Sequence, residues 1–432
     1  MSDQRNIVLV TFDSLRADHC TPWGYERDTT PTLEQWAEEG VIFKNAIAPA
    51  SRTNPSMAGI FTGEPMVVRN KPANPENARR HIDRHGTLAE ELRDAGYATG
   101  AFCPNAYASR YFGFDRGFDL YEDFLFDNDL YQDLFEKHMG DSSLDTAIRT
   151  ARNFILRQEA FKTWDSYIDQ MVEWAESQDE PFFLWAFSLD THFPYLTPRK
   201  YRQWSSLFDQ YYYNWRCNQL IDEFEIELSE KERQKILDIY DDSIYFGDVL
   251  LAELRERLSD FDPVFVVHGD HGESFDERGI YGHFYPLLYE ENIHVPLVVA
   301  GEGIEHESVE DPVSLLELPE IVKRTSGLSD GSVADLAKPW VYATDYDGRN
   351  ERDLTAIRTR DDKYIRTKEN GTVEREQFDL TTRREDGVPL KVDDEQTLDE
   401  SVVRYLGDRR VAHERELLRI RDASEALAST SY

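Results

Sequence analysis

The chain has 432 residues, 40% of them hydrophobic, which is enough for a large globular domain and a smaller one. Its 84 acidic and 48 basic residues give a net charge of −36, and 36 of the basic residues are arginine. This anionic surface argues against nucleic acid or an acidic membrane as a partner. It is typical of halophilic proteins, in which salt screens the self-repulsion.

The cysteines and the apolar runs exclude further classes of protein. Cys20, Cys103 and Cys217 form no C-x-x-C pair, so neither a disulfide framework nor a structural zinc site is expected. The apolar run at 7–12 is too short for a signal peptide, and no stretch reaches the length of a membrane span. We therefore expect a cytoplasmic protein with no membrane insertion.

Short apolar, β-branched runs alternate with helical segments in the first 300 residues. This strand–helix–strand order predicts an α/β fold with a mostly parallel central sheet and helices on both faces. We expect strands at 6–12, 41–43, 97–102, 182–189, 263–267 and 295–300, and helices at 31–40, 87–95 and 231–258.

The other segments have weaker patterns. Residues 104–180 are polar and rich in Asp, Phe and Tyr, which favours helices, and the whole of 104–240 is expected to be a variable region facing the substrate. Its tyrosines and tryptophan would either stack on a ring of the substrate or pack in the core. After a change of composition near 330, short strands are expected at 340–346, 354–359 and 363–367, and a charged amphipathic helix at 400–426. These observations predict a main domain at 1–338 and a small C-terminal sheet-and-helix subdomain at 339–432.

Three of the predicted strands end in polar clusters, at Asp13, at Asp190-Thr-His192 and at Asp270-His271. The carboxyl ends of parallel strands share one edge of a sheet, so these side chains are expected to meet there. Crowded carboxylates repel one another, and a divalent cation is the natural way to keep them ionised. Asp oxygens combined with His nitrogens suit Mn²⁺, Zn²⁺ or Mg²⁺.

The segment 48–63 contains a candidate nucleophile. Pro55 suits the first turn of a helix and Asn54 is a reasonable N-cap, which would hold Thr53 at the helix mouth, where free N–H groups favour an anion. A threonine hydroxyl attacks only when a neighbour lowers its pKa, and a bound cation would do so. Without such a neighbour, the segment would be an ordinary capped surface helix.

Taken singly, some of these residues have simpler explanations. Asp13 alone is as well explained by a helix cap as by a metal ligand, and His192 is better explained as a loop histidine. Asp270-His271 is different, because two glycines bracket it and histidines are concentrated in this part of the chain. His283 is intermediate between these cases.

Four ordered motifs lie in the first 320 residues. They are Asn6-Ile-Val-Leu-Val-Thr-Phe-Asp-Ser-Leu-Arg-Ala-Asp18, Thr53-x-Pro-Ser through Phe-Thr-Gly63, Asp270-His-Gly-Glu273, and Gly282-His with Leu288-Tyr-Glu-Glu-Asn-Ile-His-Val-Pro-Leu297. Together they resemble the sulfatase family of the alkaline phosphatase superfamily, and the tail resembles the family's small C-terminal sheet and helix.

The resemblance implies roles for individual residues. It implies that Asp13, Asp270 and His271 bind a divalent metal (Mn, Mg, Ca or Zn, one ion or two), with Thr53 as the nucleophile. Two histidines fall where the family has groups that hold the non-bridging oxygens of the ester or a second metal, namely His192 and His283. One of them would protonate the leaving oxygen. The resemblance gives no role to Arg16 and Arg52, which are nearby cations. Together with Asp190 they are candidates for positions behind the ligands or against the substrate.

Departures from the family pattern bear on the substrate. Sulfatases carry cysteine or serine at the position of Thr53, later oxidised to formylglycine, and threonine cannot form that aldehyde. Met57 stands at the arginine of their Cys-x-Pro-x-Arg motif, Ser14 at a second aspartate, His271 at a metal-binding asparagine and His283 at a lysine. Threonine nucleophiles occur in the phosphodiesterase and phosphoglycerol-transferase branches.

We therefore predict a metal-dependent hydrolase of small-molecule or glycan sulfate or phosphate esters, from a halophilic archaeon. It is expected to act faster on aryl phosphates than on the matching aryl sulfate. One alternative is a phosphoglycerol- or phosphoethanolamine-type transferase acting on a glycan or lipid precursor. The other, from a different class, is a catalytically silent metal-binding protein.

Overall fold

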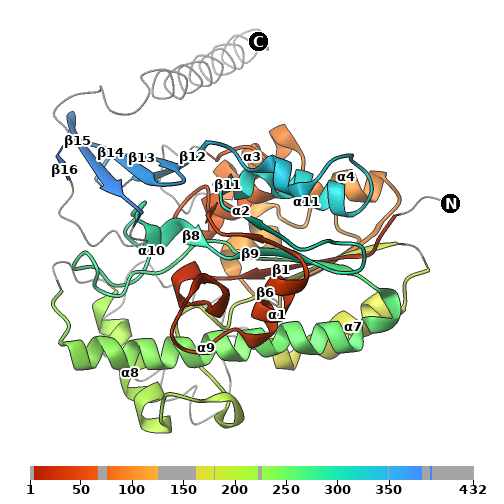
Figure 1. Cartoon of the computed structure of the whole chain (residues 1–432), viewed down its shortest axis with the longest axis horizontal. Helices are drawn as coiled ribbons and strands as arrows, with labels where there is room; N and C mark the ends of the chain where they lie inside the picture. The colour runs from red at the N-terminus through yellow and green to blue at the C-terminus, as the bar shows by residue number, and fades with distance from the viewer. Residues whose placement is uncertain are drawn as a thin grey trace, which may run out of the picture.

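The computed structural model describes residues 4–66, 75–124, 162–179, 181–221, 226–348, 350–381 and 390–391. Within these residues the chain forms a central sheet covered by helices on both faces and a second, antiparallel sheet near the C-terminus (Figure 1). This arrangement confirms the predicted α/β fold class.

The central sheet has eight strands in the order β10-β2-β9-β7-β1-β6-β4-β5. Its pairs are parallel except where β9 lies antiparallel to β2 and β7, so the sheet is mostly parallel, as expected. The strands are β1 (Ile7–Phe12), β2 (Val41–Phe43), β4 (Ala98–Phe102), β5 (Leu120–Glu122), β6 (Phe182–Ser188), β7 (Val264–Gly269), β9 (Leu297–Ala300) and β10 (Glu307–Val309).

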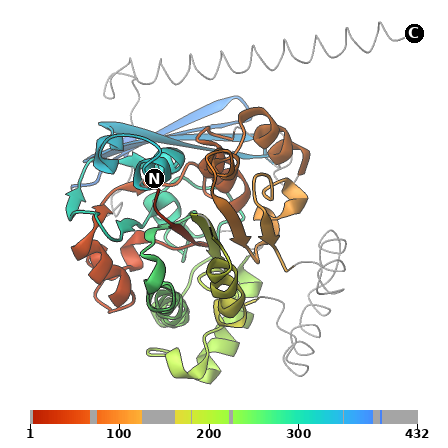
Figure 2. The same cartoon turned by 90° about the vertical axis from the view of Figure 1, so that its right-hand side faces the viewer.

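Both faces of the sheet are buried, because alternate side chains of β1 enter two separate cores. Ile7 and Leu9 belong to one, and Val8 and Val10 to the other. Figure 1 and Figure 2 show helices on each side of the sheet. One layer contains α2 (Thr53–Thr62), α3 (Pro75–His85), α4 (Leu88–Asp94) and α11 (Leu318–Thr325), and the other contains α1 (Pro31–Glu39), α7 (Ile168–Glu176), α8 (Leu207–Leu220) and α9 (Glu230–Arg257).

Three of the helices begin with a capping box, in which the N-cap hydroxyl and the carboxylate three residues later satisfy each other's backbone N–H groups. The pairs are Thr87 with Glu90 for α4, Ser206 with Asp209 for α8, and Ser229 with Glu232 for α9. The long helix predicted at 231–258 is α9, and no helix was predicted at the position of α8.

Two predictions for this domain need correction. Residues 104–124 are not helical beyond single 3-10 turns, because β5 extends the sheet beside β4 there. The strand predicted at 295–300 is two strands, because Pro296 cannot donate a ladder hydrogen bond and interrupts it. The first half, β8 (His294–Val295), joins β3 (Ala46–Ile47) and β11 (Val313–Ser314) in a small separate sheet, and the short helix α10 (Glu290–Ile293) precedes it.

The C-terminal sheet contains five antiparallel strands in sequence order. They are β12 (Trp340–Asp347), β13 (Arg352–Thr359), β14 (Asp362–Glu369), β15 (Thr372–Asp379) and β16 (Leu390–Lys391). The first three confirm the predicted strands, and β15 was not predicted. The helix predicted at 400–426 and residues 125–161 of the variable region lie outside the described residues, and the division into domains stays a prediction.

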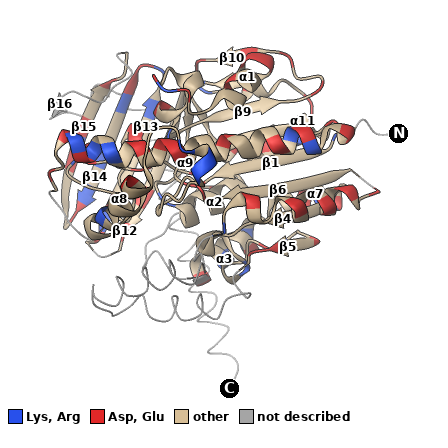
Figure 3. Ribbon diagram, turned by 90° about the horizontal axis from the view of Figure 1, so that it is seen from below, with Lys and Arg blue, Asp and Glu red and all other residues tan. Residues whose placement is uncertain are grey.

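Figure 3 shows acidic residues on α1, α7 and α9, in the helical layer that is seen from below. Among the described residues, no helix combines the length and the low polarity needed to cross a bilayer.

Candidate metal and nucleophile site

The register of three neighbouring strands brings their polar ends to one edge of the sheet. Phe12, the last residue of β1, pairs with Ser188 of β6 on one side and with Gly269 of β7 on the other. Asp13 and Asp270 directly follow their strands, so parallel pairing places the two carboxylates at the same level. Parallel strand ends are where ligands bind in such sheets.

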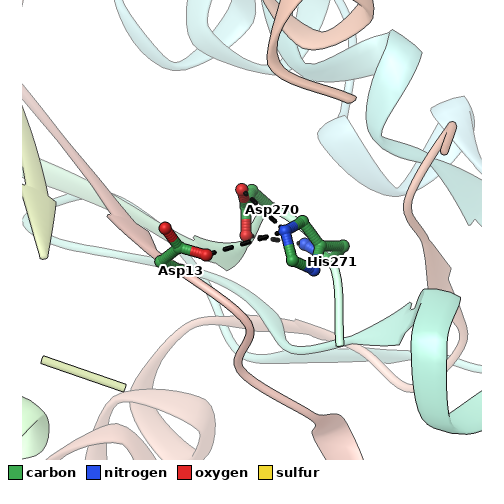
Figure 4. A group of neighbouring side chains, drawn as sticks. All are labelled: Asp13, Asp270 and His271. Atoms are coloured by element: carbon green, nitrogen blue, oxygen red, sulfur yellow. Dashed lines mark hydrogen bonds and ion pairs between the residues drawn. The ribbon is translucent and has the colours of Figure 1, made fainter. Parts of the chain in front are cut away.

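Asp13, Asp270 and His271 form a compact buried group that we call the edge cluster (Figure 4). Their ligand atoms all lie within 4.8 Å of one another, and each residue is fully buried. The His271 Nε2 atom is 3.6 Å from Asp13 Oδ1 and 3.5 Å from Asp270 Oδ2. The structure therefore brings together the three residues predicted as metal ligands.

The electrostatics of the edge cluster are unbalanced. Asp270 Oδ1 accepts hydrogen bonds from the backbone N–H groups of Ser14, at 3.0 Å, and His271, at 2.8 Å. Its Oδ2 atom is buried and has no hydrogen-bond partner in the described part of the chain. Burial raises the pKa of Asp270 well above its usual value, and the nearby charge of Asp13 raises it further. A cation bound between the two carboxylates would remove this penalty.

His271 is prepared to act as a ligand. Its Nδ1 atom lies 2.8 Å from the Gly272 carbonyl oxygen, which only accepts, so Nδ1 carries the proton and Nε2 keeps a lone pair. Burial, followed by the charge of His283, lowers the pKa of His271 to about 4, so the ring is neutral at pH 7. The donor set of two carboxylates and one neutral imidazole fits a divalent metal ion.

The glycines that flank the motif allow other backbone segments to come close. A Cβ atom on Gly272 would lie 2.1 Å from the Glu291 carbonyl oxygen, and one on Gly269 would lie 2.6 Å from the Leu15 carbonyl oxygen. Ser14, after Asp13, has a φ of 59°, a conformation that costs energy for a residue with a side chain. Larger residues in place of these two glycines would therefore not fit the loops that carry Asp13, Asp270 and His271.

Thr53 lies beside the edge cluster, at the first residue of α2. Its Oγ1 atom is 3.1 Å from His271 Nε2, and its side chain is almost fully buried. The predicted cap was wrong by two residues, because α2 begins at Thr53 with Arg52 as its N-cap. Asn54 does not cap the helix, since its side-chain amide donates to the Tyr107 carbonyl oxygen at 2.8 Å. The threonine is nevertheless at the helix mouth, as predicted.

Both additional histidines reach this site. The ring centroids of His283 and His271 are 4.5 Å apart, and those of His283 and His192 are 5.1 Å apart, so the three rings form a row. His283 Nδ1 lies 2.9 Å from the Glu273 Oε1 atom. Burial, followed by the charge of His192, lowers the pKa of His283 to about 3.

The other three candidate residues are held by hydrogen bonds and ion pairs to protein groups. Arg16 donates to Asp18 and Glu277 and to the Glu273 carbonyl oxygen. Arg52 is bound to Asp345 of β12. Asp190 accepts hydrogen bonds from the Ser188 hydroxyl at 2.8 Å and from the backbone N–H of Trp164 at 3.3 Å, and burial raises its pKa to about 7.

Three residues at the site were not predicted. The Ser14 hydroxyl donates to Asp13 Oδ1 at 3.0 Å, and the Asn105 amide donates to Asp13 Oδ2, so both orient this carboxylate. Glu273 orients His283 in the same way. Asn105 follows β4 at the same edge of the sheet, so the rule that located Asp13 and Asp270 would have found it.

Comparisons with known proteins agree with this geometry. The protein-family model described as Sulfatase matches residues 5–325. An N-acetylgalactosamine-6-O-sulfatase from Bacteroides thetaiotaomicron is 35% identical over 101 residues, which are 23% of this chain and 20% of the relative. The sequence match thus spans about a fifth of that curated relative's length.

Solved structures match over a longer stretch. A 2-O GAG sulfatase has a TM-score of 0.64 at 17% identity, with 98% of this chain and 94% of the other covered. The phosphonate monoester hydrolase of Agrobacterium radiobacter has a TM-score of 0.63 at 15% identity, with 96% of each chain covered. At these identities the likeness shows the fold. Together with the family match over three-quarters of the sequence, it shows that the chain belongs to the sulfatase family of ester hydrolases.

Proposed function

We propose that this protein is a metal-dependent hydrolase of phosphate or sulfate esters that uses Thr53 as its nucleophile. The observation that carries the proposal is the Thr53 hydroxyl, 3.1 Å from His271 Nε2 in the cluster where the buried Oδ2 atom of Asp270 has no hydrogen-bond partner among the described residues. A side chain that only capped a helix would not need two carboxylates and a neutral imidazole around it. The family match and the sulfatase and phosphonate hydrolase relatives support an ester of sulfur or phosphorus.

Asp13, Asp270 and His271 would hold the metal ion. A bound divalent cation supplies charge that lowers the pKa of a hydroxyl and offsets the negative charge of the ester oxygens. The free N–H groups at the start of α2 add a partial positive charge at the same point. The site therefore favours an anionic group placed directly in front of Thr53.

The reaction takes place in two displacements. In the first, Thr53 Oγ1, whose proton passes to solvent water, forms a bond to phosphorus or sulfur while the bond to the ester oxygen breaks, and that oxygen takes a proton from His192 or His283. In the second, a water oxygen attacks the same atom, the water gives a proton back to that histidine, and Thr53 Oγ1 leaves and takes up a proton from solvent. His283 is neutral at pH 7 because burial lowers its pKa, and an anionic ester beside it would favour its protonated form.

The threonine favours phosphate over sulfate. A formylglycine hydrate expels sulfate by collapsing to the aldehyde, and a threonine ester has no such route. Its sulfate ester would need direct attack by water, as the phosphate ester does. We therefore expect faster turnover of an aryl phosphate monoester or diester than of the matching aryl sulfate.

Parallel assays test this proposal. Nitrophenyl phosphate, its phosphodiester and nitrophenyl sulfate are compared on metal-loaded protein in high salt, with Thr53→Ala as the control. If the sulfate is the best substrate, the argument from Thr53 fails. If Thr53→Ala retains full activity, another group is the nucleophile. If no ester is turned over, the catalytically silent alternative stands.

A further inference from the structure

The segment that leads into Thr53 is held by the C-terminal sheet. Residues 49–52 pass alongside β12, where the backbone N–H of Thr344 donates to the Pro49 carbonyl oxygen at 2.9 Å. The next residue of β12, Asp345, receives the hydrogen bonds of both residues that precede the nucleophile, Ser51 and Arg52. A strand about 290 residues away in sequence thus contacts the candidate active site.

The Asp345 carboxylate is saturated with donors. Its Oδ2 atom accepts from the Ser51 backbone N–H at 3.1 Å, the Ser51 hydroxyl at 2.7 Å and Arg52 Nε at 3.3 Å. Its Oδ1 atom accepts from Arg52 Nη2 and from the Tyr346 backbone N–H, the latter at 2.7 Å. The Asp345 side chain is 1% exposed, so water does not screen these contacts.

The first turn of α2 is therefore fixed on both sides of Thr53. On one side, Ser51 and Arg52 are bound to Asp345. On the other, the Ser56 hydroxyl donates to the Asp270 carbonyl oxygen at 2.6 Å, which ties the helix to the loop that carries two of the three residues of the edge cluster. Two independent anchors on a single helical turn would set the distance from Thr53 Oγ1 to the cluster.

We propose that Asp345 is a positioning residue for the nucleophile, acting on Thr53 through Ser51 and Arg52. This inference rests on the proposed function of Thr53. It assigns part of the active site to the C-terminal sheet, and it makes Arg52 a tether whose charge is balanced by Asp345. A nucleophile displaced by 1 Å loses on the order of 100-fold in rate, whereas binding of the substrate and of the metal depends on other groups.

The test compares variants at two contacts between the C-terminal sheet and the main domain. Asp345→Asn and Ser51→Ala weaken the hydrogen bonds between Asp345 and the two residues that precede Thr53. The matched control is Lys363→Met, which breaks the buried ion pair between Lys363 Nζ and Glu290 Oε1, 3.0 Å apart, on β14 and α10. It weakens the same interface without touching residues 49–53.

We expect Asp345→Asn and Ser51→Ala each to lower kcat about 10- to 100-fold, with KM and the affinity for Mn²⁺ unchanged. Because they remove the same contact, the double variant should lose little more than either single one. Lys363→Met should lower Tm and leave kcat unchanged. Equal kcat losses in Asp345→Asn and Lys363→Met, or an unchanged kcat in Asp345→Asn, would overturn the proposal.

Hydrogen exchange at residues 53–57 gives a readout that needs no turnover. Asp345→Asn should speed amide exchange in the first turn of α2, and Lys363→Met should not. If Asp345→Asn leaves that exchange unchanged, the tether does not act on Thr53. Failure of the proposed function would instead appear in the wild-type protein, as no turnover of any ester, so the two failures are distinguishable.

Discussion

Two buried clusters combine histidine with aspartate, and they differ in how their charges are balanced. The first is the edge cluster. The second, which we call the helix cluster, consists of His19, Tyr25, Arg27, Asp238 and Asp241. Asp241 Oδ1 lies 2.8 Å from His19 Nδ1, and its Oδ2 atom accepts from Tyr25 and Arg27, each at 2.7 Å.

The difference lies in the partners of each carboxylate. Every oxygen of Asp241 has a donor, and Arg27 supplies a full positive charge that also reaches Asp238. In the edge cluster, Asp270 faces a second carboxylate and leaves one oxygen unpartnered among the described residues. Both clusters place a buried histidine beside buried aspartates, so the balance of charge is what separates a structural network from a candidate ligand site.

The largest effect expected from this difference is on activity. Thr53→Ala and Asp270→Asn should each lower kcat by about 10³-fold or more, and the double variant should lose little more, because both act in one step. Removal of the metal ion by exhaustive chelation should lower kcat of the wild-type protein by as much as either substitution. Steady-state assays on the best ester measure this. Additive losses in the double variant, or full activity after chelation, would separate Thr53 from the edge cluster.

The same chemical change in the two clusters should have opposite effects on stability. In metal-free protein, Asp241→Asn should lower the free energy of unfolding by about 3 kcal/mol, because it removes the buried carboxylate charge that pairs with Arg27. Asp270→Asn should leave it unchanged or raise it, because it removes the repulsion with Asp13. Thermal unfolding in a chelator compares them. A larger loss for Asp270→Asn than for Asp241→Asn would contradict the comparison.

A buried histidine that has no carboxylate partner in the described part of the chain sharpens the comparison. Trp185 donates to Thr11 Oγ1 at 3.0 Å, that hydroxyl lies 2.9 Å from His268 Nε2, and His268 Nδ1 lies 3.0 Å from the Gly269 carbonyl oxygen. Burial lowers the pKa of His268 to about 4, so the ring stays neutral when folded.

Between pH 6.5 and 4 the unfolded chain binds a proton at His268 that the folded chain does not. His268 should therefore make stability fall as the pH is lowered through this window, and have no further effect below it. The measurement is the slope of unfolding free energy against pH, with His268→Gln as the reference. Identical slopes for the two proteins would mean that the ring accepts its proton when folded.

The smallest effect concerns the surface charges. Stability should rise with KCl into the molar range, because the Debye length falls to about 3 Å at 1 M and the repulsion among acidic groups is screened. The paired charges of the helix cluster should respond little, so Asp241→Asn should show the same salt dependence as the wild type. A Tm that stays flat or falls between low and molar KCl would contradict the halophilic interpretation.

The three residues of the edge cluster could be predicted because they lie next to strand ends, whereas Thr53 and His283 were predicted from the motifs that contain them. Asp13 and Asp270-His271 follow apolar runs directly, so parallel pairing alone brings them together. The helix cluster was not predictable in this way. Asp238 and Asp241 belong to a long charged helix whose polar face would normally be in water, and they are buried only because the loop at 19–27 packs over them.

Contacts between distant segments also explain the parts of the fold that were not predicted. β15 was missed because Thr372-Val-Glu-Arg-Glu-Gln-Phe-Asp379 has few apolar residues, and only pairing with β14 makes it a strand. The capping of α2 was misplaced because Asn54 is engaged by Tyr107, a contact between distant segments. Local patterns predict local structure, and contacts between distant segments decide the remainder.

The strand order of the central sheet also governs when the site can form. β1 is the first strand of the chain, yet its neighbours are β6 and β7, and Thr11 pairs with a residue 257 positions later. During synthesis this apolar strand has no partner until β6 has been made, and its other edge stays unpaired until β7 has been made. Such non-local pairing slows folding and exposes strand edges to aggregation. Asp13 and Asp270 come together only when β7 pairs with β1. The metal site would therefore form late in folding, and a bound metal ion would stabilise the completed strand order.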